Sequence, residues 1–241
     1  MKNLTEKEQL AKIKTLATGA TEAKTFLLRY IDEYSLDDEA QIELVKLMAT
    51  SSTDVKEVLL KYVSDSSLDD EAQIELVKLM TTGSTDVKEV LLKYVSGSSL
   101  CDDAESELVK LMTTGSTNAK EVLLVYTLHE HLCDDAEIEL VKLMATGSKD
   151  IKEVLLTYAE KKSLADNSEV ELVKLMSTNP KDAKEVLQAY IQSLDLCALA
   201  QVELVKLMAT GSKDAKEILQ TYLKNATLCR EAQIELINLY E

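Results

Sequence analysis

Apolar residues recur along this chain at helical spacing, and the whole pattern returns every 32 residues. In the second copy of the pattern, residues 35–50 carry one apolar stripe and residues 54–64 carry another. The first stripe consists of Leu36, Ala40, Ile42, Leu44, Val45, Leu47 and Met48, and the second of Val55, Val58, Leu59 and Tyr62. Each copy is therefore predicted to be two helices joined by a short polar turn.

The hexamer Glu-Leu-Val-Lys-Leu-Met marks the period most clearly. It begins at Glu43, Glu75, Glu107, Glu139, Glu171 and Glu203, and a degenerate copy begins at Glu235. The resulting units are 3–34, 35–66, 67–98, 99–130, 131–162, 163–194 and 195–226, with a half unit at 227–241. The sequence thus predicts one continuous repeat array over residues 1–241.

Neither predicted helix can bury its apolar stripe alone, so successive helical pairs must stack to form a continuous core. We expect an all-α fold, a right-handed α-solenoid of about seven and a half helix-turn-helix repeats. The first helix of most units is followed by glycine, which favours the left-handed conformation common at helix ends. These glycines are Gly19, Gly83, Gly115, Gly147 and Gly211, and Ser51 and Asn179 occupy the same slot elsewhere.

Helix starts and the first unit carry further signals. Ser35 to Asp38 resembles a capping box, which predicts that the first helix of that unit begins near Ser35. Pro180 suits the first position of a second helix. The first helix of the chain carries the charged residues Lys7, Lys12 and Lys14, and a polar surface of this kind is typical of a terminal repeat.

With this pattern the chain resembles the tetratricopeptide and HEAT classes of helical-hairpin arrays over its full length. The resemblance is one of architecture, because the Trp-Leu-Gly-Tyr signature of tetratricopeptides is absent. In unit length and helix order the repeat is also similar to that of TAL effectors, which would imply DNA reading by two variable residues after the first helix. Here the matching segment hardly changes from unit to unit.

Composition and charge narrow the function. A net charge of −16 disfavours nucleic acid as a partner and favours a protein or peptide, with a basic one as the natural electrostatic match. The N-terminus has no apolar signal core and no apolar run is long enough to span a membrane. We therefore expect a cytoplasmic protein that does not act at a membrane, with export by a route without an apolar signal as the alternative.

The cysteines and histidines of the chain give little indication of a disulfide, a metal site or a catalytic site. Four cysteines share one repeat position, about 10 Å apart in adjacent stacked units, which is too far for a disulfide. They are Cys101, Cys133, Cys197 and Cys229. His129 and His131 lie near Cys133, but a metal site needs three or four ligands in fixed geometry. We expect no metal, no cofactor and no catalytic residue.

Two ladders of repeated residues remain as candidate surfaces. On the first helix of each unit, glutamate is followed three residues later by lysine, a spacing that places both on one face. These residues are Glu43, Lys46, Glu75, Lys78, Glu107, Lys110, Glu139, Lys142, Glu171, Lys174, Glu203 and Lys206. Seven tyrosines, from Tyr30 to Tyr222, lie on the apolar face of the second helix, where we expect them to pack between repeats.

The second helices also carry a position that varies between units. It holds Lys61, Lys93, Val125, Thr157, Ala189 and Thr221, and Val125 is the apolar residue we select as a contact candidate. The favoured hypothesis is a non-catalytic scaffold that binds a protein or peptide. A structural or engineered array without a natural ligand is the alternative, followed by TAL-effector-like nucleic-acid binding. The sequence predicts no enzyme.

Overall fold

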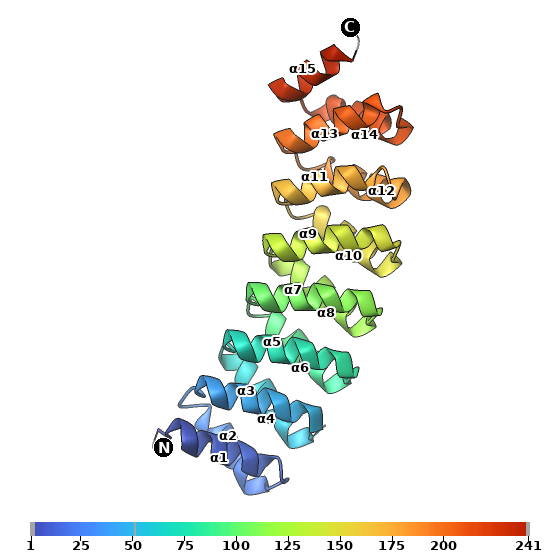
Figure 1. Cartoon of the computed structure of the whole chain (residues 1–241). Helices are drawn as coiled ribbons and strands as arrows, with labels where there is room; N and C mark the ends of the chain where they lie inside the picture. Colours follow the sequence, from blue (N-terminus) through green and yellow to red (C-terminus); the bar gives the residue numbers. More distant parts are fainter. Residues whose placement is uncertain (1–2, 51, 240–241) are drawn as a thin grey trace. The chain divides into compact units, whose positions relative to one another are not determined.

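The computed structural model describes residues 3–50 and 52–239, and every regular element in them is helical (Figure 1). The first helices of the repeats are α1 (Glu6–Leu16), α3 (Asp38–Lys46), α5 (Asp70–Leu79), α7 (Asp102–Leu111), α9 (Asp134–Leu143), α11 (Asp166–Leu175), α13 (Ala198–Ala209) and α15 (Arg230–Asn238). The second helices are α2 (Thr21–Tyr30), α4 (Thr53–Asp65), α6 (Thr85–Val95), α8 (Thr117–His129), α10 (Lys149–Ala159), α12 (Pro180–Tyr190) and α14 (Lys213–Asn225). Among the described helices, none is long and apolar enough to cross a membrane.

The chain forms two compact units, Met1–Glu130 and His131–Glu241, and the division coincides with the end of the fourth repeat. In the first unit each odd-numbered helix packs on the next odd-numbered helix, from α1 to α7, and the even-numbered helices do the same from α2 to α8. The second unit repeats this pattern, with α9, α11, α13 and α15 in one row and α10, α12 and α14 in the other. The predicted all-α solenoid is confirmed.

The core consists of the positions that the sequence pattern places on the apolar stripes. Leu44, Val45, Val58 and Leu59 are all 0% exposed, and their counterparts through the seventh repeat are at most 3% exposed. Burying one such side chain contributes roughly 1.5–3 kcal/mol. Because the second to the seventh repeats supply the same set, we expect contacts between neighbouring repeats to stabilise the array.

Helix starts differ from the prediction. The first helix of the second repeat begins at Asp38, not near Ser35, and its N-cap is Asp37. Leu36 is only 3% exposed, so the segment before the helix turns inward to bury this side chain and the helix begins after it. In the next repeat Asp69 caps α5 by accepting the N–H groups of Glu71 and Ala72 at 2.9 and 3.2 Å.

Helix ends follow the prediction at the glycines. Short 3₁₀ turns continue α3, α5, α7 and α9, namely η1 (Leu47–Thr50), η2 (Met80–Thr82), η3 (Met112–Thr114) and η4 (Met144–Thr146). Gly83 then adopts φ of 71°, in the left-handed region. Asn179 instead has φ of −132°, because Pro180 at the start of α12 restricts the residue before it to extended backbone. Ser51 lies outside the described residues.

The outer face of α1 is polar, as predicted. Where later repeats carry buried Ala40 and Leu44, this helix carries exposed Glu8 and Lys12. The Lys12 ammonium lies 4.9 Å from the centroid of the Phe26 ring, a cation–π contact that covers part of the ring. These substitutions give the first repeat a solvated outer surface.

Candidate binding surfaces

A buried polar residue occupies the same place in the first helix of each of the first seven repeats, and it was not among the residues predicted from the sequence. It is glutamine or glutamate, and at seven positions it is no more than 6% exposed. These positions are Gln9, Gln41, Gln73, Glu105, Glu137, Glu169 and Gln201. A polar group so deeply buried must find hydrogen-bond partners, or its desolvation would destabilise the fold.

Gln41 shows the glutamine arrangement. Its Oε1 accepts the backbone N–H of Asp69, the N-cap residue of the next repeat, at 2.8 Å, and its Nε2 donates to the Leu36 carbonyl at 3.0 Å. Gln73 bonds in the same way to the next repeat, accepting the N–H of Cys101 at 2.7 Å. The side-chain amide therefore ties the start of each first helix to the preceding repeat.

Glu137 shows the glutamate arrangement, which lacks an amide donor. Its Oε1 accepts the N–H of Ala165 at 2.6 Å, and its Oε2 accepts the hydroxyl of Tyr158 at 3.0 Å. Glu169 likewise accepts the hydroxyl of Tyr190 at 2.5 Å. Burial raises the pKa of Glu137 and of Glu169, and the hydrogen bonds that each carboxylate accepts offset part of the increase. Glutamate at this position therefore retains the inter-repeat bond but introduces a buried charge.

The tyrosine ladder is buried, and that it packs between repeats stays a prediction. All seven side chains are at most 2% exposed, namely Tyr30, Tyr62, Tyr94, Tyr126, Tyr158, Tyr190 and Tyr222. Their hydroxyl groups also accept backbone N–H groups, as when Tyr158 accepts from Leu132 at 3.2 Å. Burial raises the pKa of Tyr94 to about 12. The ladder is therefore structural, and its hydroxyl groups belong to the buried network.

A second ladder, of ion pairs, links successive even-numbered helices. Lys56 on α4 reaches Asp86 and Glu89 on α6, at 2.8 and 2.6 Å. The same pairing recurs at Lys24 in the first compact unit and at Lys152 and Lys184 in the second. The bonded carboxylates raise the pKa of Lys56. These lysines are thus already neutralised by the fold.

The predicted Glu/Lys ladder of the odd-numbered helices lies at the surface. Its glutamates are half-buried and its lysines are exposed. Glu107 and Lys110 approach to 3.8 Å, and among the described residues no other i, i+3 pair of this ladder comes within 4 Å. Val125 is half-buried on α8. That the ladder or Val125 contacts a partner stays a prediction.

The cysteines lie at the N-caps of the odd-numbered helices. The thiol sulfurs of Cys197 and Cys229 accept the N–H of Ala200 and Ala232, each at 3.4 Å. Burial, together with the nearby carboxylates, raises the pKa of Cys197 to about 11, so its thiol is protonated at neutral pH. Such a thiol is a weak nucleophile, and the position serves as a helix cap.

The two histidines belong to different compact units. His129 ends α8, whereas His131 opens the second unit and packs edge-on against Tyr158 with ring centroids 6.3 Å apart. Within residues 3–50 and 52–239, no group of three or more His, Cys, Asp or Glu side chains could hold a metal ion.

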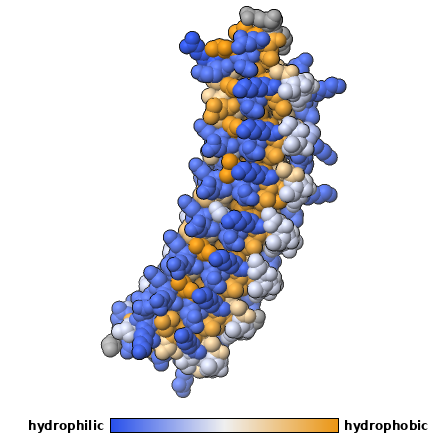
Figure 2. Space-filling view, in the orientation of Figure 1, coloured by the Kyte–Doolittle hydropathy of each residue, from blue (hydrophilic) through white to orange (hydrophobic). Residues whose placement is uncertain are grey.

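An acidic hollow lies between the starts of α3 and α5. It has a volume of about 470 Å³ and is lined by Asp38, Glu39, Ile42, Asp69, Asp70 and Glu71. None of the first-turn carboxylates Asp38, Asp70 and Glu71 forms an ion pair with a described residue. Figure 2 shows the setting, in which hydrophilic side chains cover most of the visible face and hydrophobic ones appear between them.

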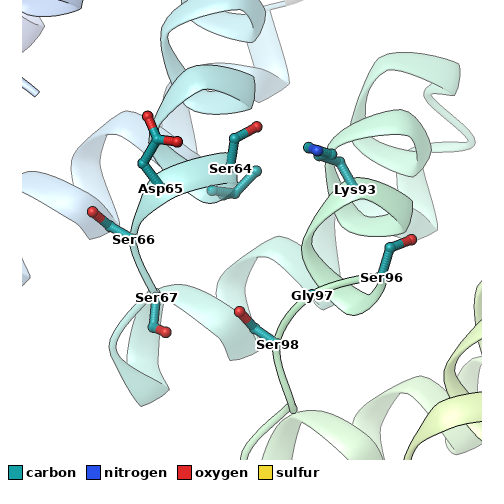
Figure 3. A pocket seen from close by; sticks show the side chains of 9 residues that line it. Ser64, Asp65, Ser66, Ser67, Lys93, Ser96, Gly97 and Ser98 are labelled. Atoms are coloured by element: carbon teal, nitrogen blue, oxygen red, sulfur yellow. The ribbon is translucent and has the colours of Figure 1, made fainter. Parts of the chain in front are cut away.

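A second hollow lies between the loops that follow α4 and α6 (Figure 3). It measures about 260 Å³ and brings Lys93 near Ser64, Ser66, Ser67, Ser96 and Ser98. The hydroxyls of Ser64 and Ser96 donate to carbonyl groups of their own helices, at 2.8 and 2.6 Å. Because those two protons are already used, this hollow is a weaker candidate for a ligand.

Comparison with protein-family models, with curated proteins and with solved structures finds no match for this chain. Function must therefore be argued from the surfaces described above. Of these surfaces, the acidic hollow is the strongest candidate. It combines a volume of about 470 Å³ with carboxylates that form no ion pair with a described residue and the apolar side chain of Ile42.

Proposed function

We propose that this protein is a non-catalytic scaffold that binds a basic segment of a protein or peptide, and that the hollow between α3 and α5 is a contact site. The observation that carries the proposal is the gathering of five carboxylates around Ile42 in one surface hollow. An extended basic peptide can place ammonium or guanidinium groups against the carboxylates and an apolar side chain on Ile42.

Helix stability explains only part of this acidity. Acidic residues in a first turn interact favourably with the helix dipole, by roughly 0.3–1 kcal/mol each. Several carboxylates in adjacent first turns also repel one another. That repulsion is visible at Glu6, whose pKa is raised by a hydrogen bond with the Glu39 carboxyl and by the charges of Glu39, Asp37 and Asp38. A basic partner would relieve it.

Asp69 adds a more specific feature. Its Oδ1 caps α5, whereas its Oδ2 is buried and has no hydrogen-bond partner among the described residues. A donor from a basic side chain entering the hollow would satisfy this oxygen after a small movement. An unsatisfied buried acceptor beside a solvent-filled hollow is consistent with a surface completed by binding.

The test is fluorescence anisotropy with a labelled dodecapeptide of lysine and leucine. The variant D38N/D70N removes two exposed carboxylates of the hollow, and the matched control D134N/D166N changes the same repeat position on α9 and α11. We expect D38N/D70N to weaken binding by about tenfold at low ionic strength while the control binds as the parent does. Equal weakening in both variants would show that binding depends on the overall charge of the protein and not on this hollow.

A further inference from the structure

A row of lysines distinguishes the second compact unit from the first. At the first or second position of the even-numbered helices, the first four repeats carry Thr21, Thr53, Thr85 and Thr117, and the next three carry Lys149, Lys181 and Lys213. All seven side chains are exposed. A cation at a helix N-terminus is disfavoured by the helix dipole, so stability does not account for the change from threonine to lysine.

These lysines also lack the ion pairs that neighbouring lysines of the same helices form. Lys152 and Lys184, one turn further along the same helices, pair with carboxylates of the next helix. By contrast, Lys149, Lys181 and Lys213 form no ion pair within the described residues. The fold therefore leaves positive charge available at this edge of an otherwise acidic protein.

A hollow of about 640 Å³ opens beside this row, between α10 and α12. Lys149, Lys152 and Lys181 lie along it with Asp182, and Leu156, Thr157, Glu153 and Glu160 complete the lining. Thr157 is one of the lining residues. The equivalent residue in the second repeat is the longer Lys61, which pairs with Asp32 of the preceding repeat at 2.9 Å and with Asp65 of its own helix at 2.7 Å.

We propose that the α10–α12 hollow binds an acidic peptide segment. Carboxylates of the segment pair with Lys149 and Lys181, and an aliphatic or aromatic side chain packs on half-buried Leu156. The volume is in the range of sites that hold one large side chain with its backbone. This site is independent of the acidic hollow between α3 and α5, which lies in the other compact unit and has no lysine in its lining.

A peptide fits the hollow better than a nucleic acid does. Closely spaced phosphates would approach Glu153, Glu160 and Asp182, which line the same hollow. An acidic peptide can space its carboxylates to reach the lysines and avoid the glutamates. Of the two, only a peptide supplies an apolar side chain that can pack on Leu156.

The experiment is fluorescence anisotropy of the full chain with a labelled dodecapeptide of glutamate and leucine. K149T/K181T installs the residue that the first four repeats already carry, so the fold is expected to tolerate it. K216T/K224T removes the same charge from exposed positions of α14 and serves as the control. L156Q introduces the residue that α12 carries at the equivalent position, Gln188.

We expect K149T/K181T to weaken binding about tenfold at low ionic strength, and K216T/K224T to change it less than twofold. L156Q should weaken binding without changing its salt dependence, because it removes an apolar contact and no charge. Equal effects of the two lysine variants, or absence of peptide binding by the parent, would overturn the proposal. So would a single-stranded oligonucleotide that binds with the same variant sensitivity in place of the peptide.

Discussion

The effect of the buried glutamates on the free energy of unfolding can be tested by substitution. Replacing Glu137 by glutamine, E137Q, installs the side chain that other repeats carry at Gln41, Gln73 and Gln201. The amide retains the acceptor for the Ala165 N–H, which Glu137 now holds at 2.6 Å. It also gains a donor, which in Gln201 reaches both the Leu196 carbonyl at 2.7 Å and the Tyr222 hydroxyl at 3.1 Å.

The expected change in the free energy of unfolding follows from these contacts. E137Q adds one buried hydrogen bond, a net gain of about 1 kcal/mol, and removes the desolvation penalty of a carboxylate that is 2% exposed. We therefore expect E137Q to raise the free energy of unfolding by about 1–2 kcal/mol at pH 7. The reverse change in a glutamine repeat, Q73E, should lower it by a similar amount.

The raised pKa of Glu137 determines how the stability gained in E137Q changes with pH. Because burial raises the folded-state pKa of Glu137 above its unfolded value, its contribution to stability is full below the unfolded pKa and is lost as the pH rises through the folded pKa. The advantage of E137Q should therefore be small near pH 4.5 and largest at neutral pH. Urea unfolding followed by far-UV circular dichroism measures it. An E137Q protein no more stable than the parent at pH 7 would refute the reasoning.

Three further predictions follow from the packing and the charges. Leu76→Ala, at a fully buried position, should cost about 2–5 kcal/mol in the free energy of unfolding, whereas a loss under 1 kcal/mol would show that the site is not in the core. Lys56→Met breaks the pairs to Asp86 and Glu89 and should lower the melting temperature at low salt but not in about 1 M NaCl, and a salt-independent decrease would point to packing. The Cys197 thiol, with its pKa raised to about 11, should react with a disulfide reagent at pH 8 much more slowly than a free thiol, and equal rates would contradict its burial.

The helical pairs could be predicted from the sequence because local spacing determines them. The apolar stripes at Leu44 and Val58 and the glycine at Gly83 each report on their own helix or turn, and the structure places them accordingly. The start of α3 was less predictable, because the helix begins only after the chain has turned to bury Leu36.

The contacts between repeats could not be predicted in the same way. Gln41 and Asp69 are 28 residues apart, and Lys56 and Asp86 are 30 apart, so their pairing depends on the rotation between stacked repeats. A signal was nevertheless present in the sequence. The position of Gln41 holds only glutamine or glutamate in every repeat, which is more restricted than a solvated helix face requires.

The most direct test of the scaffold proposal is to observe the hollow itself during binding. Methyl-labelled isoleucine in the full chain reports on Ile42, which lines the acidic hollow, and on Ile13 and Ile218, which are 0% exposed in the core. On titration with the lysine–leucine dodecapeptide, we predict a saturable shift of the Ile42 methyl resonances with those of Ile13 and Ile218 unchanged. Peptide binding that leaves the Ile42 resonances in place would contradict the proposal.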